Sequence, residues 1–401
     1  MGKTHPESVV CFPFKNEDAK VFIKNIKEAL EHPRVAEVIC VGYEKDECYK
    51  AVESAVPFLQ KEKGKRVHLI LQKKLGEKRS GKGDAMNTAL TFFINQTPYG
   101  RIHFYDADIV TFNREWITKT EEKLDQNFQV ARCSFPKAPT DGMITWNITR
   151  CGFAYNWPET FLPEIEQPLG GELAFRREIA QELIKDRWVL KYSDWGIDTA
   201  YMLAFCQYKA PIYEVYIRNG KLHKLYGQLT DLYTMLVECF TIIQENQSVK
   251  IDTNGILYHK DSIDIASVPQ EIQHKKAFDV EGTVSLLREN WSPQEKELLD
   301  TFPAKIREGM LALQKSGTVD VRFMDPETWY EVYGVLLRYF DQKSLIWSDL
   351  LFHLWVARVL NHTFYFASKG FRQAMESLYR MVTSFEHRRR KGPLIRGQIA
   401  A

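Results

Sequence analysis

The chain has 401 residues, of which 44% are hydrophobic and 26% charged, a composition typical of a folded protein that excludes long disorder as its main state. Its 54 Lys and Arg nearly balance its 52 Asp and Glu, and a net charge of +2 gives no reason to expect nucleic acid or an anionic membrane as a partner. No run approaches the roughly 18 apolar residues of a spanning helix, and the first residues lack the apolar core of a signal peptide.

The first hundred residues alternate between short apolar runs and segments with helical spacing. The pattern predicts strands at 8–14, 35–41, 67–72 and 101–106, and helices at 17–31, 45–62 and 84–95. We expect the second helix to be kinked or split at Pro57. This alternation predicts an α/β fold with a mostly parallel sheet, helices on both faces and ligands at the carboxyl edge of the strands.

The pattern of apolar residues changes at about residue 231, after which they recur at helical spacing. Breakers such as Ser292-Pro293, Asp325-Pro326 and Lys369-Gly370 separate the segments. The expected helices are 231–246, 281–290, 294–315, 326–340, 345–361 and 367–385. The sequence therefore predicts two domains, a catalytic domain over 1–230 and an all-helical domain over 231–401.

Two carboxylates, Asp106 and Asp108, follow the expected strand at 101–106. In an extended segment residues i and i+2 point the same way, so both carboxylates can face one ligand. Carboxylate oxygens suit Mg²⁺ or Mn²⁺ holding a diphosphate, which is the layout of the Asp-x-Asp motif of nucleotide-sugar transferases. Two solvated loop acids are the alternative.

The loop from Gly76 to Gly83 matches most of a phosphate-binding P-loop, Gly-x-x-x-x-Gly-Lys. Gly83 stands where such a loop needs a hydroxyl for Mg²⁺, and the loop follows the third strand rather than the first. We therefore favour a mobile basic loop whose Lys82 reaches a donor phosphate. Asp84 is expected to cap the helix that follows.

Three further motifs are candidates for ligand contacts. Ser193–Asp198 places Trp and Gly beside two acids, which is typical of a sugar-facing turn, although Asp194 could also be a helix cap. The glycines in 166–172 allow the backbone to approach a ligand closely. His223, in a loop bounded by glycines, is a candidate metal ligand beside the upstream acid pair.

Six motifs occur in order: Phe-Pro-Phe-Lys15, Gly-Lys82-Gly, Tyr-Asp106-Ala-Asp108, Gln-Pro-Leu169-Gly-Gly-Glu, Ser-Asp-Trp-Gly-Ile-Asp198 and Lys-x-His223-x-Leu-Tyr-Gly. Over residues 9–245, and more weakly beyond, this order resembles the mannosylglycerate synthases, a retaining glycosyltransferase family with the GT-A fold. The resemblance implies transfer of mannose from GDP-mannose to D-glycerate or a similar small hydroxy acid, giving a compatible solute.

The resemblance also assigns residues to roles. It implies Asp108 and His223 as ligands of a divalent metal, Mg²⁺ or Mn²⁺ with Ca²⁺ as a third candidate. It implies Asp198, Asp106 and Lys82 as catalytic residues and places the acceptor on Lys137, Asp141 and Thr145. The implied nucleotide-sugar contacts are Pro13, Phe14, Lys15, Tyr43, Gln72, Lys82, Asp106, Ala107, Leu169, Asp198 and Tyr226.

One position departs from the resemblance. After Phe135-Pro136 we expect an arginine facing the glycerate carboxylate, and this chain has Lys137. Lysine keeps the charge but loses the bidentate fork, which leaves the breadth of acceptors open.

Two other classes of protein remain open: a P-loop-like or nucleotidyl-transfer enzyme using the loop 76–83, and a catalytically silent sugar-nucleotide-binding protein. Seven cysteines without a Cys-x-x-Cys pair indicate a reduced, cytoplasmic setting. We expect no nucleic-acid or membrane partner and leave self-association into a homo-oligomer open.

Overall fold

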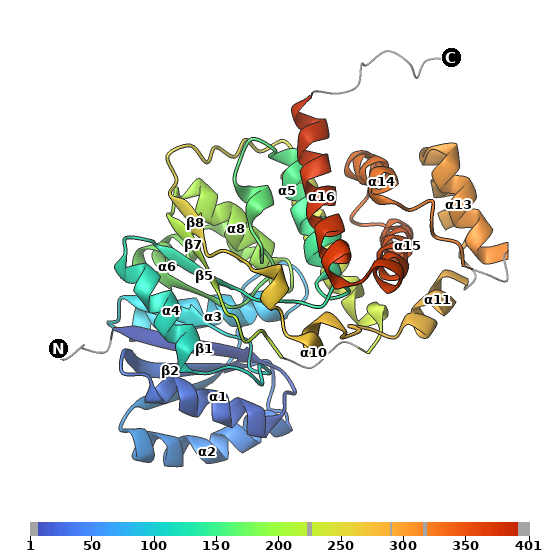
Figure 1. Cartoon of the computed structure of the whole chain (residues 1–401). Coiled ribbons are helices and arrows are strands. Elements are labelled where there is room, and N and C mark those ends of the chain that lie inside the picture. Colours follow the sequence, from blue (N-terminus) through green and yellow to red (C-terminus); the bar gives the residue numbers. More distant parts are fainter. Residues whose placement is uncertain (1–6, 223–226, 289–290, 316–318, 392–401) are drawn as a thin grey trace. The chain divides into compact units, whose positions relative to one another are not determined.

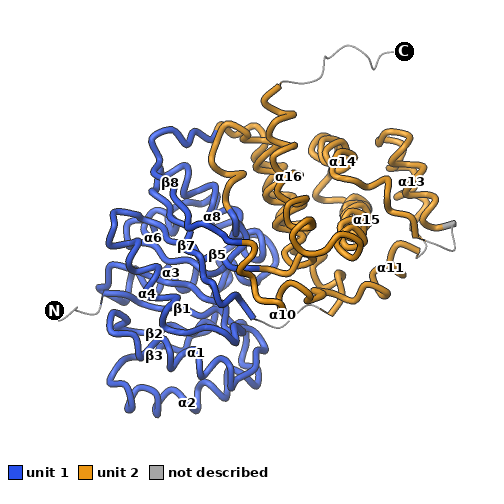
Figure 2. The backbone as a smooth tube through the Cα atoms, viewed as in Figure 1, with its two compact units in different colours: residues 1–136, 166–224, 251–264 blue, residues 137–165, 225–250, 265–401 orange. Residues whose placement is uncertain are grey.

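The computed structural model describes residues 7–222, 227–288, 291–315 and 319–391. The chain forms two compact units, one comprising residues 1–136, 166–224 and 251–264 (unit 1), the other residues 137–165, 225–250 and 265–401 (unit 2) (Figure 2). The units interleave along the chain, so residues 137–165 belong to the second unit although strands of the first follow them. The domain boundary predicted at residue 230 stays a prediction.

Unit 1 begins with the predicted alternation of strands and helices (Figure 1). The elements are β1 (Ser8–Phe14), α1 (Ala19–Glu31), β2 (Val35–Gly42), α2 (Glu47–Lys63), β3 (Arg66–Leu71), α3 (Lys82–Gln96) and β4 (Arg101–Phe104). The fourth strand is shorter than predicted, so Asp106 stands beyond its end.

Helix α2 contains Pro57 and is not split, so that part of the prediction is wrong. Proline removes one N–H donor and crowds the carbonyl of residue i−4, here Glu53. Both Pro57 and Glu53 are exposed, and solvent can replace the missing donor there.

The rest of unit 1 completes one sheet with the strand order β3-β2-β1-β4-β6-β5-β7-β8. Strand β6 runs antiparallel to β4 and β5, and all other neighbouring pairs are parallel. The added elements are α4 (Arg114–Asp125), β5 (Val130–Ser134), β6 (Leu173–Arg176), α6 (Arg177–Leu183), α7 (Arg187–Leu190), α8 (Ile197–Gln207), β7 (Ile212–Tyr216) and β8 (Tyr258–Lys260).

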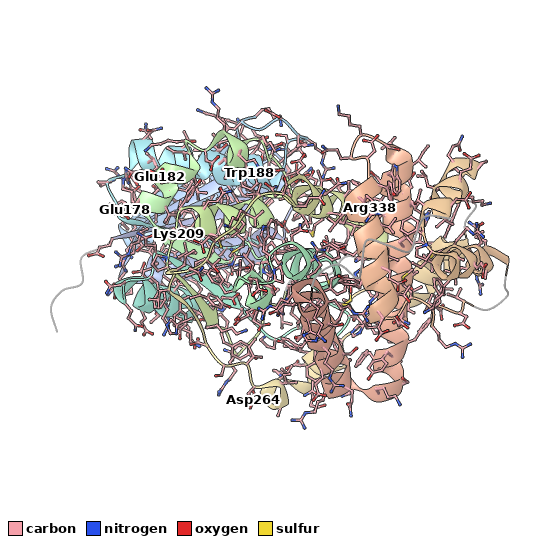
Figure 3. The ribbon with its side chains drawn as sticks, turned by 90° about the horizontal axis from the view of Figure 1, so that it is seen from above. Glu178, Glu182, Trp188, Lys209, Asp264 and Arg338 are labelled. Atoms are coloured by element: carbon pink, nitrogen blue, oxygen red, sulfur yellow. The ribbon has the colours of Figure 1, made fainter. Side chains whose placement is uncertain are left out.

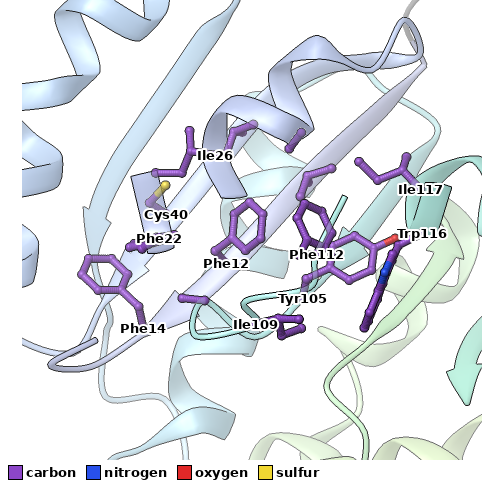
Figure 4. Close-up of a cluster of buried hydrophobic side chains, with 14 of the residues drawn as sticks. Phe12, Phe14, Phe22, Ile26, Cys40, Tyr105, Ile109, Phe112, Trp116 and Ile117 are labelled. Carbon is purple, nitrogen blue, oxygen red and sulfur yellow. The ribbon is translucent and has the colours of Figure 1, made fainter. Parts of the chain in front are cut away.

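Helices cover both faces of the sheet. On the face of α1 and α4, Phe12 packs edge-on against Phe22 and Phe112, with ring centroids 5.7 and 5.6 Å apart (Figure 4). On the face of α3, α6 and α8, Phe175 of β6 meets Phe104 and Phe205 at 5.9 and 5.8 Å. The predicted α/β fold, with a mostly parallel sheet and helices on both faces, is confirmed.

Helix α6 turns one apolar side to this sheet. Glu178 and Glu182, four residues apart on α6, are exposed at the outer edge in Figure 3, whereas Ile179 and Leu183 are buried. Because residues three and four apart share a face of a helix, α6 has one solvent-exposed face and one buried face.

Unit 2 is helical, as predicted for the second half of the chain. Its helices are η1, a π-helix (Thr145–Arg150), α5 (Cys151–Asn156), η2 (Leu162–Glu164), η3 (Leu229–Leu232), α9 (Tyr233–Glu245), η4 (Ile265–Ser267), α10 (Gln270–Gln273), α11 (Val280–Arg288), α12 (Pro293–Leu298), η5 (Leu299–Thr301), α13 (Ala304–Lys315), α14 (Pro326–Tyr339), α15 (Leu345–Lys369) and α16 (Phe371–Arg390). The helix expected over 294–315 is broken because Phe302 precedes Pro303 and is extended. Within the described ranges, no helix combines the length and apolarity needed to cross a membrane.

Candidate active site

The carboxyl ends of the parallel strands β1, β2, β3 and β4 meet at one edge of unit 1, as expected for such a sheet. Tyr43, after β2, donates its backbone N–H to the carbonyl of Phe14, and the Nζ of Lys15 lies 3.9 Å from the centroid of the Tyr43 ring. Gln72, after β3, donates its backbone N–H to Gly42. The predicted nucleotide contacts from β1, β2 and β3 are thus gathered at this edge.

Two of the predicted contact residues keep their side chains in the core. The ring of Phe14 is 4% exposed and packs on Phe22, 4.7 Å away between centroids. Ala107 is buried, and its carbonyl accepts a hydrogen bond from the side chain of Asn25. Phe14 and Ala107 can therefore contact a ligand only through their backbone.

The three residues predicted to be catalytic lie together. Lys82, the first residue of α3, has its Nζ 3.1 Å from Oδ2 of Asp198 in α8 and 3.4 Å from Oδ1 of Asp106 beyond β4. All three side chains are largely shielded from solvent, with Asp106 the most open at 28% exposed. We call this group, with the two residues described next, the strand-end cluster.

Two members of the strand-end cluster were missed at the sequence level. The Nζ of Lys221 lies 2.5 Å from Oδ2 of Asp106 and 2.5 Å from Oε1 of Glu172. Both residues stand in motifs singled out above, where only the glycines of 166–172 and His223 were assigned a role.

The strand-end cluster shifts the acidity of its members in opposite directions. Burial alone would lower the pKa of Lys82, but Asp106, Asp198 and Glu172 outweigh it and raise that pKa. Burial likewise opposes ionisation of Asp106, yet Lys221 and Lys82 hold its pKa well below the usual range. For Glu172, burial and then the charge of Asp106 raise the pKa to about 7. The cluster therefore keeps two fixed ammonium groups and one carboxyl that titrates near neutrality.

Two carboxylate oxygens of the strand-end cluster, Oε2 of Glu172 and Oδ1 of Asp198, have no hydrogen-bond partner among the described residues. Asp198 is 3% exposed, and its Oδ1 is buried with no hydrogen-bond partner among the residues that the structure describes. Leaving a buried acceptor unpaired costs about 1–3 kcal/mol, so such an atom in a folded protein calls for an explanation. A ligand hydroxyl that donates to this oxygen would supply one.

Carboxylates hold the basic loop between β3 and α3. Asp84 accepts the backbone N–H groups of Leu75 and Gly76 and the hydroxyl of Ser80, so it organises the loop rather than capping α3. Asp194 accepts from the backbone of Lys82 and from Arg79, so it serves the start of α3 and not that of α8. Both predicted capping roles are corrected.

Arg132 of strand β5 holds the loop that precedes β6. One guanidinium nitrogen of the buried Arg132 donates to the carbonyls of Gln167, Pro168 and Gly170, which leaves Leu169 half-exposed between them. A Cβ on Gly171 would stand 2.6 Å from both Asp106 Oδ1 and Lys82 Nζ, so no side chain fits there without displacing that ion pair.

The predicted metal ligands are only partly described. Asp108 is half-buried beyond β4, and His223 and Tyr226 lie outside the described residues. Leu222 is tied to the same strand end, since its carbonyl accepts from the N–H of Val110 and its own N–H donates to the hydroxyl of Thr111. The described residues contain no group of three or more His, Cys, Asp or Glu placed to hold a metal ion. A single accessible carboxylate fits a divalent ion that takes further oxygens from a diphosphate.

The predicted acceptor residues meet within unit 2, around Gly142 (φ +66°). A Cβ built on Gly142 would stand 3.0 Å from Nζ of Lys137 and 3.7 Å from Oγ1 of Thr145. Asp141 accepts the N–H of Gly142 at 2.7 Å. The segment is held further by Nε2 of His362, 3.0 Å from the carbonyl oxygen of Pro139.

Known proteins resemble this chain along most of its length. The family model for the GT domain of mannosylglycerate synthase matches residues 8–245, and that for the C-terminal domain matches residues 272–382. A mannosylglycerate synthase from Rhodothermus marinus is 47% identical over 380 residues, covering 95% of this chain and 94% of the relative. One from Selaginella moellendorffii is 44% identical over 382 residues, covering 95% and 90%.

Among solved structures, a glucosyl-3-phosphoglycerate synthase from Mycobacterium tuberculosis in complex with phosphoglyceric acid is similar at a TM-score of 0.47 and 18% identity, covering 62% of this chain and 82% of its own.

Proposed function

This chain belongs to the mannosylglycerate synthase family and is a glycosyltransferase, and from that premise we propose that it moves mannose from GDP-mannose to D-glycerate with retention of the anomeric configuration. The product would be mannosylglycerate. Similar small hydroxy acids are secondary acceptors under this proposal.

The observation that carries the proposal is the unpartnered Oδ1 of Asp198 beside the Lys82–Asp106 pair. A hydroxyl of the transferred hexose would donate to Oδ1, while Lys82 donates to Oδ2 and orients the carboxylate. The fixed charge of Lys82 also favours the charge that grows on the departing diphosphate.

The nucleotide of the donor would lie along the ends of β1, β2 and β3, where Lys15 and Tyr43 are stacked. Pro13, Phe14, Gln72 and Tyr226 complete the proposed donor contacts, and Leu169 would pack on the sugar. Arg132 holds the carbonyls on either side of Leu169, which supports a fixed sugar contact at that position.

A divalent ion, Mg²⁺ or Mn²⁺ with Ca²⁺ as a third candidate, would be held by Asp108 and His223 and by oxygens of the diphosphate. When bound, such an ion neutralises charge on the leaving diphosphate. The hydrogen bonds of Leu222 to Val110 and Thr111 support this assignment, because they bring the residue before His223 to the strand end that carries Asp108.

The acceptor would bind to Lys137, Asp141 and Thr145, with its carboxylate on Lys137 and a hydroxyl on Thr145. Transfer then forms a bond from an acceptor hydroxyl oxygen to the anomeric carbon and breaks the bond from that carbon to the diphosphate, which leaves with the electron pair. In front-face attack the acceptor proton passes to the leaving phosphate oxygen. In double displacement the Asp198 carboxylate displaces the diphosphate at the anomeric carbon, and the acceptor hydroxyl then displaces Asp198 while its proton passes to the departed diphosphate. Both routes retain the anomer.

The second candidate, a P-loop-like or nucleotidyl-transfer enzyme, is disfavoured by the loop between β3 and α3. Two of its N–H groups, those of Leu75 and Gly76, already donate to Asp84, and the N–H of Lys82 donates to Asp194. A phosphate cradle needs such groups free to face the anion.

The decisive experiment is a matrix of nucleotide-sugars against small hydroxy acids, with product anomers identified by NMR. We expect turnover to be greatest with GDP-mannose and D-glycerate and the product to be the α-anomer. Release of sugar 1-phosphate, with the nucleotide transferred to the acceptor, would favour the nucleotidyl-transfer alternative, and binding without any turnover would favour the silent one.

Two variants test the assigned ligands. Lys137→Ala should raise the acceptor KM at least about tenfold, since one charge-assisted bond contributes roughly 1.5–3 kcal/mol, and leave the donor KM nearly unchanged. Lys137→Arg, the matched control, should retain activity.

His223→Ala should raise the concentration of Mn²⁺ needed for half-maximal rate, and full activity at limiting Mn²⁺ would show that His223 is not a ligand.

A further inference from the structure

The helix that carries Thr145 changes its winding at that residue. After two helical residues, Met143 and Ile144, the chain continues as the π-helix η1 (Thr145–Arg150) and then as α5. A π-turn is rare, and in known proteins it concentrates at functional sites. Thr145, proposed above to bind the acceptor, is therefore the first residue of an unusual turn.

The π-turn decides which way the acceptor residues face. It holds one residue more than an α-turn, and each helical residue corresponds to about 100° of rotation about the axis. Compared with a regular α-helix that extended α5 toward the N-terminus, Thr145 and the loop around Gly142 are therefore rotated by about 100° around the helix axis. Restoring a regular helix would turn Thr145 away from its present direction.

Two side chains of α14 hold the π-turn through its carbonyls. The indole N–H of Trp329 donates to the carbonyl of Asn147 at 2.9 Å, and the hydroxyl of Tyr333 donates to the carbonyl of Ile148 at 2.8 Å. Trp329 and Tyr333 are four residues apart, so they lie on one face of α14, and both are fully buried. Such bonds are selective, because a shift of the turn would leave two buried donors unpaired.

A glycine makes room for one of these donors. A Cβ on Gly152, the second residue of α5, would stand 2.5 Å from the hydroxyl oxygen of Tyr333 and 2.6 Å from a methyl carbon of Ile243. Glycine in a helix costs about 1 kcal/mol relative to alanine. At this position it is what allows the Tyr333 hydroxyl to come close to the backbone.

We propose that Trp329 and Tyr333 are positioning residues for the acceptor: by holding the π-turn 145–150 they orient Thr145 toward the acceptor hydroxyl. The proposal rests on the acceptor site of the proposed function and gives α14 of the helical unit a part in acceptor selection. Neither side chain contacts the substrate in this proposal; both act through the backbone of residues 147 and 148.

Tyr333→Phe tests the proposal, because it removes one hydroxyl and keeps the ring. The matched control is Tyr233→Phe, which removes a comparable hydroxyl bond, 2.7 Å to Asp349, elsewhere in unit 2. We expect Tyr333→Phe to raise the acceptor KM about fivefold, as for one lost hydrogen bond, with the donor KM unchanged. Combined Trp329→Phe and Tyr333→Phe should raise it further, and Gly152→Ala should act in the same direction.

Hydrogen exchange on the full chain gives a readout that does not depend on turnover. Tyr333→Phe should speed exchange in peptides that span 143–152, and Tyr233→Phe should not. Suppose that the wild-type enzyme transfers sugar to D-glycerate and that Tyr333→Phe changes neither the acceptor KM nor this exchange. This result would overturn the inference about the π-turn and leave the proposed function standing. A wild-type enzyme that does not use D-glycerate overturns the proposed function, and with it the acceptor role of the π-turn.

Discussion

The sheet of unit 1 has a buried cluster of charges at each end, and the two clusters differ in how they are satisfied. At the amino end, both carboxylate oxygens of Glu121 have hydrogen-bond partners. Oε1 is bonded to Ser8 and to His103 at 2.7 Å, and Oε2 is bonded to Arg101 and to Arg34 at 3.0 Å. These partners stand at or near the starts of β1, β2 and β4. The amino end is a closed ion pair network that ties strand starts to α4.

The strand-end cluster at the carboxyl end has more carboxylates than ammonium groups. Asp106, Asp198 and Glu172 share Lys82 and Lys221, and Oδ1 of Asp198 has no partner among the described residues. Both ends bury charged side chains, so buried charge alone does not mark a functional site. The difference lies in the acceptors of the strand-end cluster that are unpaired within the described part of the chain, Oδ1 of Asp198 and Oε2 of Glu172, which indicate where a ligand belongs.

The largest expected effect separates the clusters by function. Asp198→Asn should lower kcat about a hundredfold or more with little change in donor affinity, the pattern of a lost transition-state interaction. Steady-state kinetics and titration with GDP-mannose measure both quantities. Near-normal kcat, or loss of donor binding alone, would show that Asp198 does not act at the sugar.

The reciprocal change at the amino end should affect stability instead. Glu121→Gln breaks a buried charge network and should lower the free energy of unfolding by about 3 kcal/mol, measured by urea denaturation. The folded variant should keep the wild-type kcat, because the cluster stands at the end of the sheet away from the proposed site. A large fall in kcat at a temperature where the variant is folded would remove the distinction between the two ends.

A smaller effect is expected from a pair of glycines. Gly171→Ala would place a methyl group 2.6 Å from Lys82 Nζ and Asp106 Oδ1, whereas Gly100→Ala, just before β4, would meet nothing within 4 Å. We expect Gly171→Ala to lower kcat about tenfold by displacing the ion pair, and Gly100→Ala to behave as wild type. Equal activity of the two variants would mean that the strand-end cluster tolerates rearrangement.

The smallest effect is a difference in pH dependence. The pKa of Glu172 is raised to about 7 from about 4.5, so the folded state binds more protons in that window and the contribution of Glu172 to stability falls as pH rises from 4.5 to 7. The pKa of Glu121 is lowered, because its donors outweigh burial, so its contribution is complete above about 4.5 and is lost as pH falls.

Urea unfolding without added ligand or metal measures both slopes. Glu172→Gln should make stability less dependent on pH between 5 and 7, and Glu121→Gln should remove part of the acid-side loss below pH 5. An unchanged slope in Glu172→Gln would show that this carboxyl does not titrate near neutrality.

Much of this molecule follows from local pattern. Periodicity along the chain located the first four strands and most helices of the second half, and the rule that parallel strands end at one edge placed Asp106 and Lys82 at a common site. The motif ending in Asp198 pointed to the same cluster. Helix and strand patterns depend on residues two to four apart, which a sequence displays directly, and the common edge follows from the parallel order of the strands.

Other features were decided only by tertiary structure. The partners of Asp84 and Asp194 are a preceding loop and a helix start far along the chain, not the helices that they adjoin. Lys221 lies 49 residues from Glu172 and 115 from Asp106. The local sequence pattern also does not indicate the antiparallel direction of β6 or the π-turn that begins at Thr145. A buried charge or an unusual turn takes its partners from whatever the packing of distant segments brings within hydrogen-bond reach, and that choice is made by the folded chain as a whole.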